Sequence, residues 1–135
     1  MIAWAVKYSR KNIDVRLPSH QIIHCEVADT PQKMAQGLMY RTHLEPLHGM
    51  IFIMPSESSN LTFWMKNTLI PLDIIWLNHE KKILYISSNT PPCTSQETTC
   101  PIYAPAANQN AQYVIEINAG LAQQFNLEPG QRLRF

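Results

Sequence analysis

The sequence IIWLNHEKKILYI, residues 74–86, decides the fold class. It holds two mostly apolar runs, residues 74–77 and 82–86, separated by the polar residues 78–81. Short runs rich in β-branched and aromatic residues on either side of a polar stretch are typical of two strands joined by a turn. The segment therefore predicts a β-hairpin, the clearest supersecondary element in the chain.

Further strands are expected on both sides of this hairpin, where apolar and polar residues alternate with a period of two or form short apolar runs. The segments are residues 13–17, 23–27, 50–54, 63–65, 113–118 and 133–135. Two short helices are also expected. One follows Thr30, a good N-cap before Pro31, and ends near Arg41. The other contains Leu121 and Phe125.

Polar segments separate these elements. Residues 56–60 are expected to form a loop, and residues 89–111, with four prolines, a long one. Strands do not alternate with helices and no segment repeats, so the sequence predicts a mainly β fold: a single-domain β-sandwich or barrel-like jelly roll with one or two short helices. We expect one domain over residues 1–135, in which residues 1–12 form a flexible or extended N-terminal segment.

The composition, 45% hydrophobic and 16% charged, is that of a globular domain. The formal net charge of +1 provides no long-range field for nucleic acid or an anionic membrane, so we expect neither partner. No apolar run is long enough to cross a bilayer. Lys7, Arg10 and Lys11 follow the apolar start, the reverse of an export signal. We therefore expect a cytoplasmic protein, or a periplasmic or secreted one if the N-terminus is truncated.

The segment FWMKNTLIPLD, residues 63–73, places four polar side chains between two hydrophobic stretches. They are the cation of Lys66, the amide of Asn67, the hydroxyl of Thr68 and the carboxylate of Asp73. Polar groups that become buried must pair with one another or meet a ligand. The spacing favours an ordinary Lys66–Asp73 ion pair beside a turn. The alternative is a cleft where both groups transfer protons or hold an anionic substrate.

Two of the three cysteines, Cys93 and Cys100, lie in the expected long loop with six residues between them. They form either a disulfide or a pair of thiols, one of which could be a nucleophile or a metal ligand. Cys25 is expected in the core. His20 and His24 fall in or beside a strand, where four residues span roughly 13 Å, so we expect no metal site. With four glycines and no phosphate loop, we expect no cofactor.

Three motifs carry a family resemblance: QGLMYR at residues 36–41, GMIF at 49–52 and FWMKNTLIPLDII at 63–75. The chain resembles the domain-of-unknown-function 192 family, an uncharacterised family of bacteria and archaea, over about residues 22–135. The resemblance implies a compact β-sandwich of jelly-roll type with a short helix after the first matched strand, and no established reaction. Many members of the family look exported and have a hydrophobic leader. After the turn glycine, many members carry Asp, where this chain has Gln131.

Three functions remain open. The one we favour is a binding module for a small polar or anionic ligand. Its candidate residues are Arg41, Trp64, Lys66, Asn67, Thr68 and Asp73. The second is an enzyme that uses Lys66 and Asp73 for acid–base chemistry, or Cys93 as a nucleophile. The third is a structural or protein-interaction domain in which the polar segment is a buried network that defines the fold.

Overall fold

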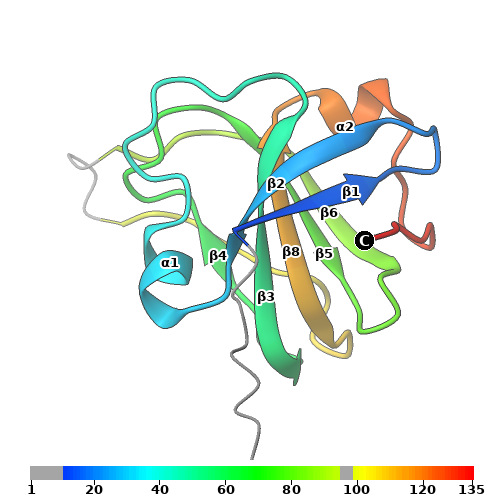
Figure 1. The fold of residues 1–135 in the computed structure, drawn as a ribbon. Helices are drawn as coiled ribbons and strands as arrows, with labels where there is room; N and C mark the ends of the chain where they lie inside the picture. Colours follow the sequence, from blue (N-terminus) through cyan, green and yellow to red (C-terminus); the bar gives the residue numbers. More distant parts are fainter. Residues whose placement is uncertain (1–10, 95–98) are drawn as a thin grey trace, which may run out of the picture.

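A computed structural model of the chain describes residues 11–94 and 99–135 (Figure 1). The elements are β1 (Asn12–Arg16), β2 (Ile22–Ala28), α1 (Pro31–Gln36), β3 (His48–Ser58), β4 (Phe63–Trp64), β5 (Leu72–Leu77), β6 (Ile83–Thr90), β7 (Ile102–Tyr103), β8 (Ala111–Asn118) and α2 (Leu121–Gln124). The prediction for an N-terminal segment, residues 1–12, lies mostly outside the described residues, and β1 begins at its last residue.

Six strands form one mixed sheet in the order β1-β2-β3-β8-β5-β6, and β4 pairs with β7 in a separate two-stranded sheet. All neighbours in the large sheet are antiparallel except β2 and β3, which are parallel. Parallel neighbours need a crossover connection, and α1 lies in it. The predicted mainly β fold is confirmed. Within the described ranges the strands close no barrel, and the parallel pair departs from the antiparallel pairing of a jelly roll.

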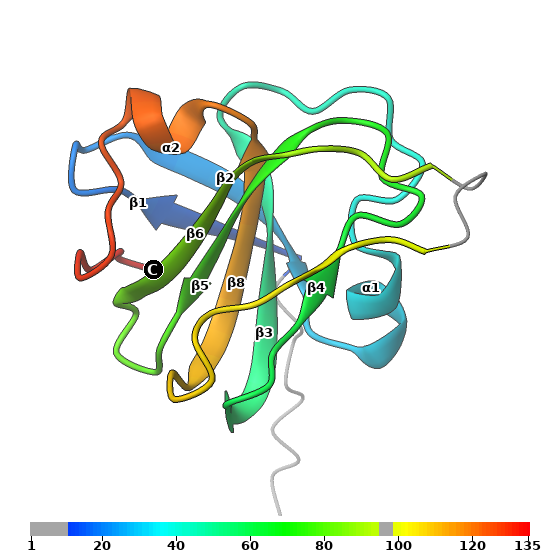
Figure 2. The ribbon, with the colours of Figure 1, turned by 180° about the vertical axis from the view of Figure 1, so that it is seen from behind.

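The large sheet is covered on both faces, and each face has its own apolar core. Figures 1 and 2 show α1 and β4 at one side of the molecule and α2 at the other. One core contains Ile51, Ile75 and Ile115 with Ala122 of α2 and the C-terminal Leu133. The other core contains Leu38, Phe52, Met65, Trp76 and Val114. Because β5 lies between the two cores, all six of its residues are buried.

The predicted hairpin is confirmed as β5 and β6. The side chain of Asn78 holds its turn, since Oδ1 accepts hydrogen bonds from the backbone N–H groups of Glu80 and Lys82 at 2.9 and 3.0 Å. Lys81 takes a left-handed φ of 66° in the same turn. The polar residues between the two apolar runs therefore satisfy the backbone of the turn. The short helix predicted at Leu121 is confirmed as α2.

The first helix is shorter than predicted. The side chain of Thr30 accepts a hydrogen bond from the backbone N–H of Lys33, as an N-cap should, and Pro31 is the first helical residue. The helix ends at Gln36 and does not reach Arg41, because Gly37 adopts φ 49° and ψ −131° and turns the chain toward the sheet.

The strand boundaries also differ from the predictions. β3 continues to Ser58, through most of the segment predicted as a loop, because Ser58 pairs with Ala111 of β8. The long segment predicted as a loop contains β7. Residues 133–135 form no regular strand, since Arg134 makes only an isolated bridge to Arg16 of β1. Pairing partners far away in the sequence decided these three outcomes.

Candidate functional site

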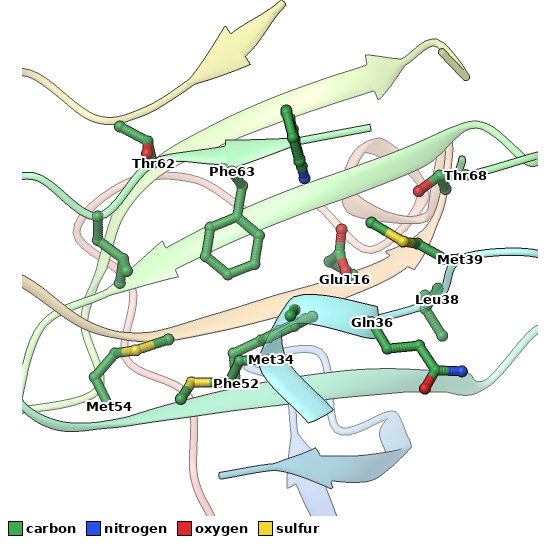
Figure 3. Close-up of a pocket in the computed structure, with 14 residues that line it drawn as sticks. Met34, Gln36, Leu38, Met39, Phe52, Met54, Thr62, Phe63, Thr68 and Glu116 are labelled. Carbon is green, nitrogen blue, oxygen red and sulfur yellow. The ribbon is translucent and has the colours of Figure 1, made fainter. Parts of the chain in front are cut away.

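A pocket of about 310 Å³ opens on the face of the sheet that carries α1, and we call it the α1 pocket (Figure 3). Residues 34–39, from α1 and the turn after it, form one wall, and residues 61–64 form the opposite wall. β3 and β8 form the floor. The lining residues are Met34, Ala35, Gln36, Gly37, Leu38, Met39, Phe52, Met54, Leu61, Thr62, Phe63, Trp64, Thr68 and Glu116.

The turn at Gly37 brings α1 close to the sheet. A Cβ on Gly37 would lie 3.2 Å from Cζ of Phe52, which is tighter than an ordinary contact. The next residue, Leu38, is almost fully buried and anchors the turn in the core. The backbone N–H of Tyr40 then donates to the carbonyl of Asn67 at 2.9 Å. The turn is thus attached both to the sheet and to the segment after β4.

Glu116 is the acidic residue on the floor of the α1 pocket. It lies in β8, paired with Met50 of β3 on one side and Ile74 of β5 on the other. Only 5% of the residue is exposed, and Figure 3 shows its carboxyl group rising between Phe63 and Met39. Within the part of the chain that the structure describes, the carboxyl group makes no hydrogen bond or ion pair.

Burial raises the pKa of the Glu116 carboxyl from 4.5 to about 8, and desolvation is the cause. The group is therefore mostly protonated at neutral pH. A buried carboxyl without a partner costs free energy, and a perturbed ionisation in a concave site is a recognised sign of function.

The sequence does not single out Glu116, because alternation in residues 113–118 places it on the polar side of a half-buried strand. β8 lies between β3 and β5 and is covered on both faces, so it has no solvent-facing side. One sequence signal does indicate that this side of the strand is buried. Val114 is apolar and lies on the same side of the strand as Glu116.

Aromatic rings form much of the remaining lining. The rings of Phe52 and Phe63 meet edge to face with centroids 4.8 Å apart, and Phe63 meets Trp76 in the same way at 6.0 Å. Trp64 lines the pocket and is 47% exposed. The ammonium group of Lys66 lies 5.1 Å from the centroid of the Trp64 ring, a cation–π contact.

Thr68, from the polar segment at residues 63–73, lines the α1 pocket. Lys66 is exposed and forms no ion pair in the described ranges, so the predicted Lys66–Asp73 pair is absent there. Asn67 adopts a left-handed φ of 57°, and its backbone N–H donates to the carbonyl of Cys93 at 2.8 Å. Oδ1 of Asn67 is buried and finds no hydrogen-bond partner among the described residues.

Asp73 is fully buried and does not line the α1 pocket. Its Oδ1 accepts a hydrogen bond from the backbone N–H of Asn89 at 2.8 Å. Its Oδ2 accepts from the backbone N–H groups of Gly120 and Ala122 at 3.0 and 2.9 Å. Asp73 therefore fixes the start of α2 and the end of β6, through backbone hydrogen bonds and not through the expected ion pair with Lys66.

Arg41 lies next to the α1 pocket, in a neighbouring hollow of about 470 Å³ that also contains Lys11 and Lys33. Its guanidinium donates to both carboxylate oxygens of Glu26, and the contact of Nη2 with Oε1 measures 3.0 Å. This hydrogen-bonded partner lowers the pKa of Glu26. Gly37 borders both spaces.

Cys93 and Cys100 form a disulfide, the first of the two alternatives left open by the sequence. Cys93 also bridges to Lys66 and Thr68 through the backbone, so the disulfide lies directly beside the polar segment. The thiol needed for the nucleophile hypothesis is not free while the disulfide is intact. Cys25 is a buried free cysteine in the core, as predicted, and burial raises its pKa to about 12.

Residues 11–94 and 99–135 contain no group of three or more His, Cys, Asp or Glu side chains arranged to hold a metal ion. No helix in these ranges has the length and apolar composition needed to span a membrane.

The fold and the pocket define a β-rich domain with a ligand-sized cavity on one face of a six-stranded sheet. The chain belongs to the DUF192 family, described as "Uncharacterized ACR", whose model matches residues 13–135. The predicted family resemblance is confirmed, and the match begins nine residues earlier than predicted, at 13 instead of 22.

Two solved structures are similar to this chain over most of its length. A protein of unknown function from Novosphingobium aromaticivorans shares 34% identity, with a TM-score of 0.73 and coverage of 92% of this chain and 84% of the other. A "putative transcription regulator" from Sinorhizobium meliloti shares 30% identity, with a TM-score of 0.74 and coverage of 91% of both chains. No curated protein matches the chain.

Proposed function

We propose that this domain is a small-molecule-binding module and that the α1 pocket is its binding site. One observation carries the proposal: a nearly buried carboxyl group, that of Glu116, faces the cavity and has no partner in the described part of the chain. Small-molecule sites are typically concave and mostly apolar, with a few polar groups that orient the ligand. The α1 pocket has this composition, and its volume of about 310 Å³ suits a compact ligand.

The candidate residues divide between this site and its surroundings. Trp64 and Thr68 line the α1 pocket. Lys66 contacts Trp64, and Asn67 holds the backbone of the neighbouring turn. Arg41 belongs to the neighbouring hollow, where an anionic ligand would compete with Glu26 for its guanidinium.

An enzyme is our second candidate. The observation in its favour is the pKa of Glu116, raised to about 8 by burial, because a carboxylic acid that is protonated at neutral pH can act as a general acid. In this version Glu116 takes the acid–base role predicted for Lys66 and Asp73. The regulator name of the Sinorhizobium meliloti protein adds little here, since a net charge of +1 provides no field for DNA.

We also propose that α1 and the β4–β7 pair form the second layer of an incomplete sandwich. This layer covers the face of the sheet that contains Phe52 and Trp76. The α1 pocket is then the space that the incomplete layer leaves open.

The test is a thermal-shift screen of small organic molecules against three proteins. They are the wild type, the variant Ala35→Trp, which fills the α1 pocket from its wall, and the control Ala107→Trp, which adds the same side chain at an exposed site away from it. We expect active compounds to raise the melting temperature of the wild type and the control but not of Ala35→Trp. Compounds that stabilise all three equally would show that binding occurs elsewhere, and the absence of any active compound would count against a binding module.

A further inference from the structure

We infer that the α1 pocket takes a small organic cation, an ammonium group on an apolar body, with the Glu116 carboxylate as its counter-ion. This inference rests on the proposed function and names the ligand class of the same site.

The charge of the lining supports a cation. Glu116 is the only ionisable acid or base among the fourteen lining residues, which include no Lys, Arg or His. An anionic ligand would therefore find no cationic partner in the pocket and would meet a carboxyl group on its floor. An ammonium group would pair with the ionised carboxyl, which removes the cost of leaving that group buried alone.

The aromatic rings support the same ligand class. Phe52, Phe63 and Trp64 line the cavity, and the faces of such rings attract cations, with Trp the strongest. Trp64 already interacts with one cation, since the ammonium of Lys66 lies 5.1 Å from its ring centroid. The thioethers of Met34, Met39 and Met54 add a polarisable apolar lining for the body of the ligand.

The residues directly around Glu116 carry no charge, so a bound cation would be the main influence on its ionisation. Its neighbours are Met50 of β3, Ile74 of β5 and Gly37 of the turn after α1, none of them charged. The charged groups on the surrounding strands are Glu26 of β2, which pairs with Met50 and with Arg41, and Asp73 of β5, which pairs with Ile117 and is held by backbone N–H groups. Lys33 of α1 lies in the neighbouring hollow, and Lys66 lies beside Trp64.

Binding should therefore release a proton. In the empty pocket, burial holds the pKa of Glu116 at about 8, so the group is neutral at pH 7. When a cation binds, the O–H bond of the carboxylic acid breaks, the proton passes to solvent and the carboxylate pairs with the ammonium. The apparent affinity should rise about tenfold for each pH unit up to about 8 and then level off.

The experiment compares 2-phenylethylamine, which stays protonated below about pH 9, with the neutral 2-phenylethanol. Dissociation constants are measured by calorimetry between pH 6 and 9 for the wild type, for Glu116→Gln and for Glu128→Gln, which makes the same change at an exposed site. We expect the amine to bind the wild type and Glu128→Gln with this pH dependence. Glu116→Gln should bind it at least tenfold more weakly at pH 8, while the alcohol should show no pH dependence with any of the three proteins.

A lysine side chain offers the same ammonium group on an apolar chain, so Nα-acetyl-lysine N-methylamide is a third probe. Tighter binding of this probe than of 2-phenylethylamine would indicate a peptide as the source of the cation. The inferred ligand class is wrong if the alcohol binds as tightly as the amine. It is also wrong if the only compounds whose binding is lost in Ala35→Trp are not cations. In both cases the α1 pocket remains the binding site. If Ala35→Trp affects no compound, the proposed function itself fails.

Discussion

The backbone of Gly37 packs against the carboxyl group of Glu116: a Cβ on Gly37 would lie 3.7 Å from Oε1 of Glu116 and 3.2 Å from Cζ of Phe52. Gly37 ends α1, and Glu116 lies in the interior of the sheet. This contact therefore connects the wall of the α1 pocket to its floor.

The first prediction concerns Gly37→Ala. The substitution places a Cβ at φ 49° and 3.2 Å from Phe52, so it adds backbone strain and crowding together. We expect a loss of about 2–3 kcal/mol in the free energy of unfolding, measured by urea denaturation. Gly130→Ala is the matched control, because Gly130 has φ 94° but no atom within 4 Å of an added Cβ. It should show only the strain, about 1 kcal/mol. Equal losses in the two variants would contradict the close approach of α1 to the sheet.

The second prediction concerns the pH dependence of stability. Because burial raises the pKa of Glu116 from 4.5 in the unfolded chain to about 8, the folded state holds one more proton than the unfolded state between these values. The contribution of Glu116 to stability is therefore fully present below about pH 4.5 and falls as the pH rises toward 8. Glu116→Gln cannot ionise and should escape this loss.

We expect the free energy of unfolding of Glu116→Gln, relative to the wild type, to increase by on the order of 3–5 kcal/mol between pH 5 and pH 9. Urea denaturation at both pH values measures this difference. The exposed Glu128→Gln should show the same difference from the wild type at both pH values. A difference between Glu116→Gln and the wild type that does not change with pH would mean that the carboxyl group ionises normally.

The third prediction separates structure from ligand binding at Asp73. In Asp73→Asn an NH₂ group replaces one of the two oxygens that accept three backbone hydrogen bonds, so a donor faces a donor in a buried site. We expect a loss of about 2–4 kcal/mol in the free energy of unfolding, against less than about 1 kcal/mol for Asp14→Asn, whose side chain makes an exposed hydrogen bond with His24. Folded Asp73→Asn should still bind the compounds that bind the wild type. If Asp73→Asn lost that binding and kept the stability of the wild type, Asp73 would have a direct role in ligand binding.

The sequence predicts the parts of the fold that local pattern determines. The hairpin of residues 74–86 and the N-cap at Thr30 depend on neighbouring residues and are confirmed. The parallel pairing of β2 with β3 and the extension of β3 to Ser58 depend on strands distant in the sequence, and no local pattern specifies them.

The candidate site shows the same limit. Trp64 and Thr68 were predicted because an unusual polar segment draws attention to them, and both line the α1 pocket. Glu116 was not predicted, because a single acidic residue in an alternating strand looks solvent-exposed until the sheet places β8 between two covered faces. The sequence places Asp73 among the site candidates because it is close to Lys66. In the structure its carboxylate accepts a hydrogen bond from the backbone N–H of Ala122 in α2.

The fourth prediction concerns the disulfide between Cys93 and Cys100. Closing so short a loop should stabilise the fold by about 2 kcal/mol, so a reductant should lower the melting temperature of the wild type. Cys93→Ser/Cys100→Ser should melt lower and should not respond to the reductant. Because the carbonyl of Cys93 accepts from the backbone N–H of Asn67, hydrogen exchange at Asn67 should accelerate in this variant, while exchange at Ile75 in the sheet should change much less. Equal acceleration at both amides would show that the disulfide acts on the whole fold and has no particular role in holding the segment beside the α1 pocket.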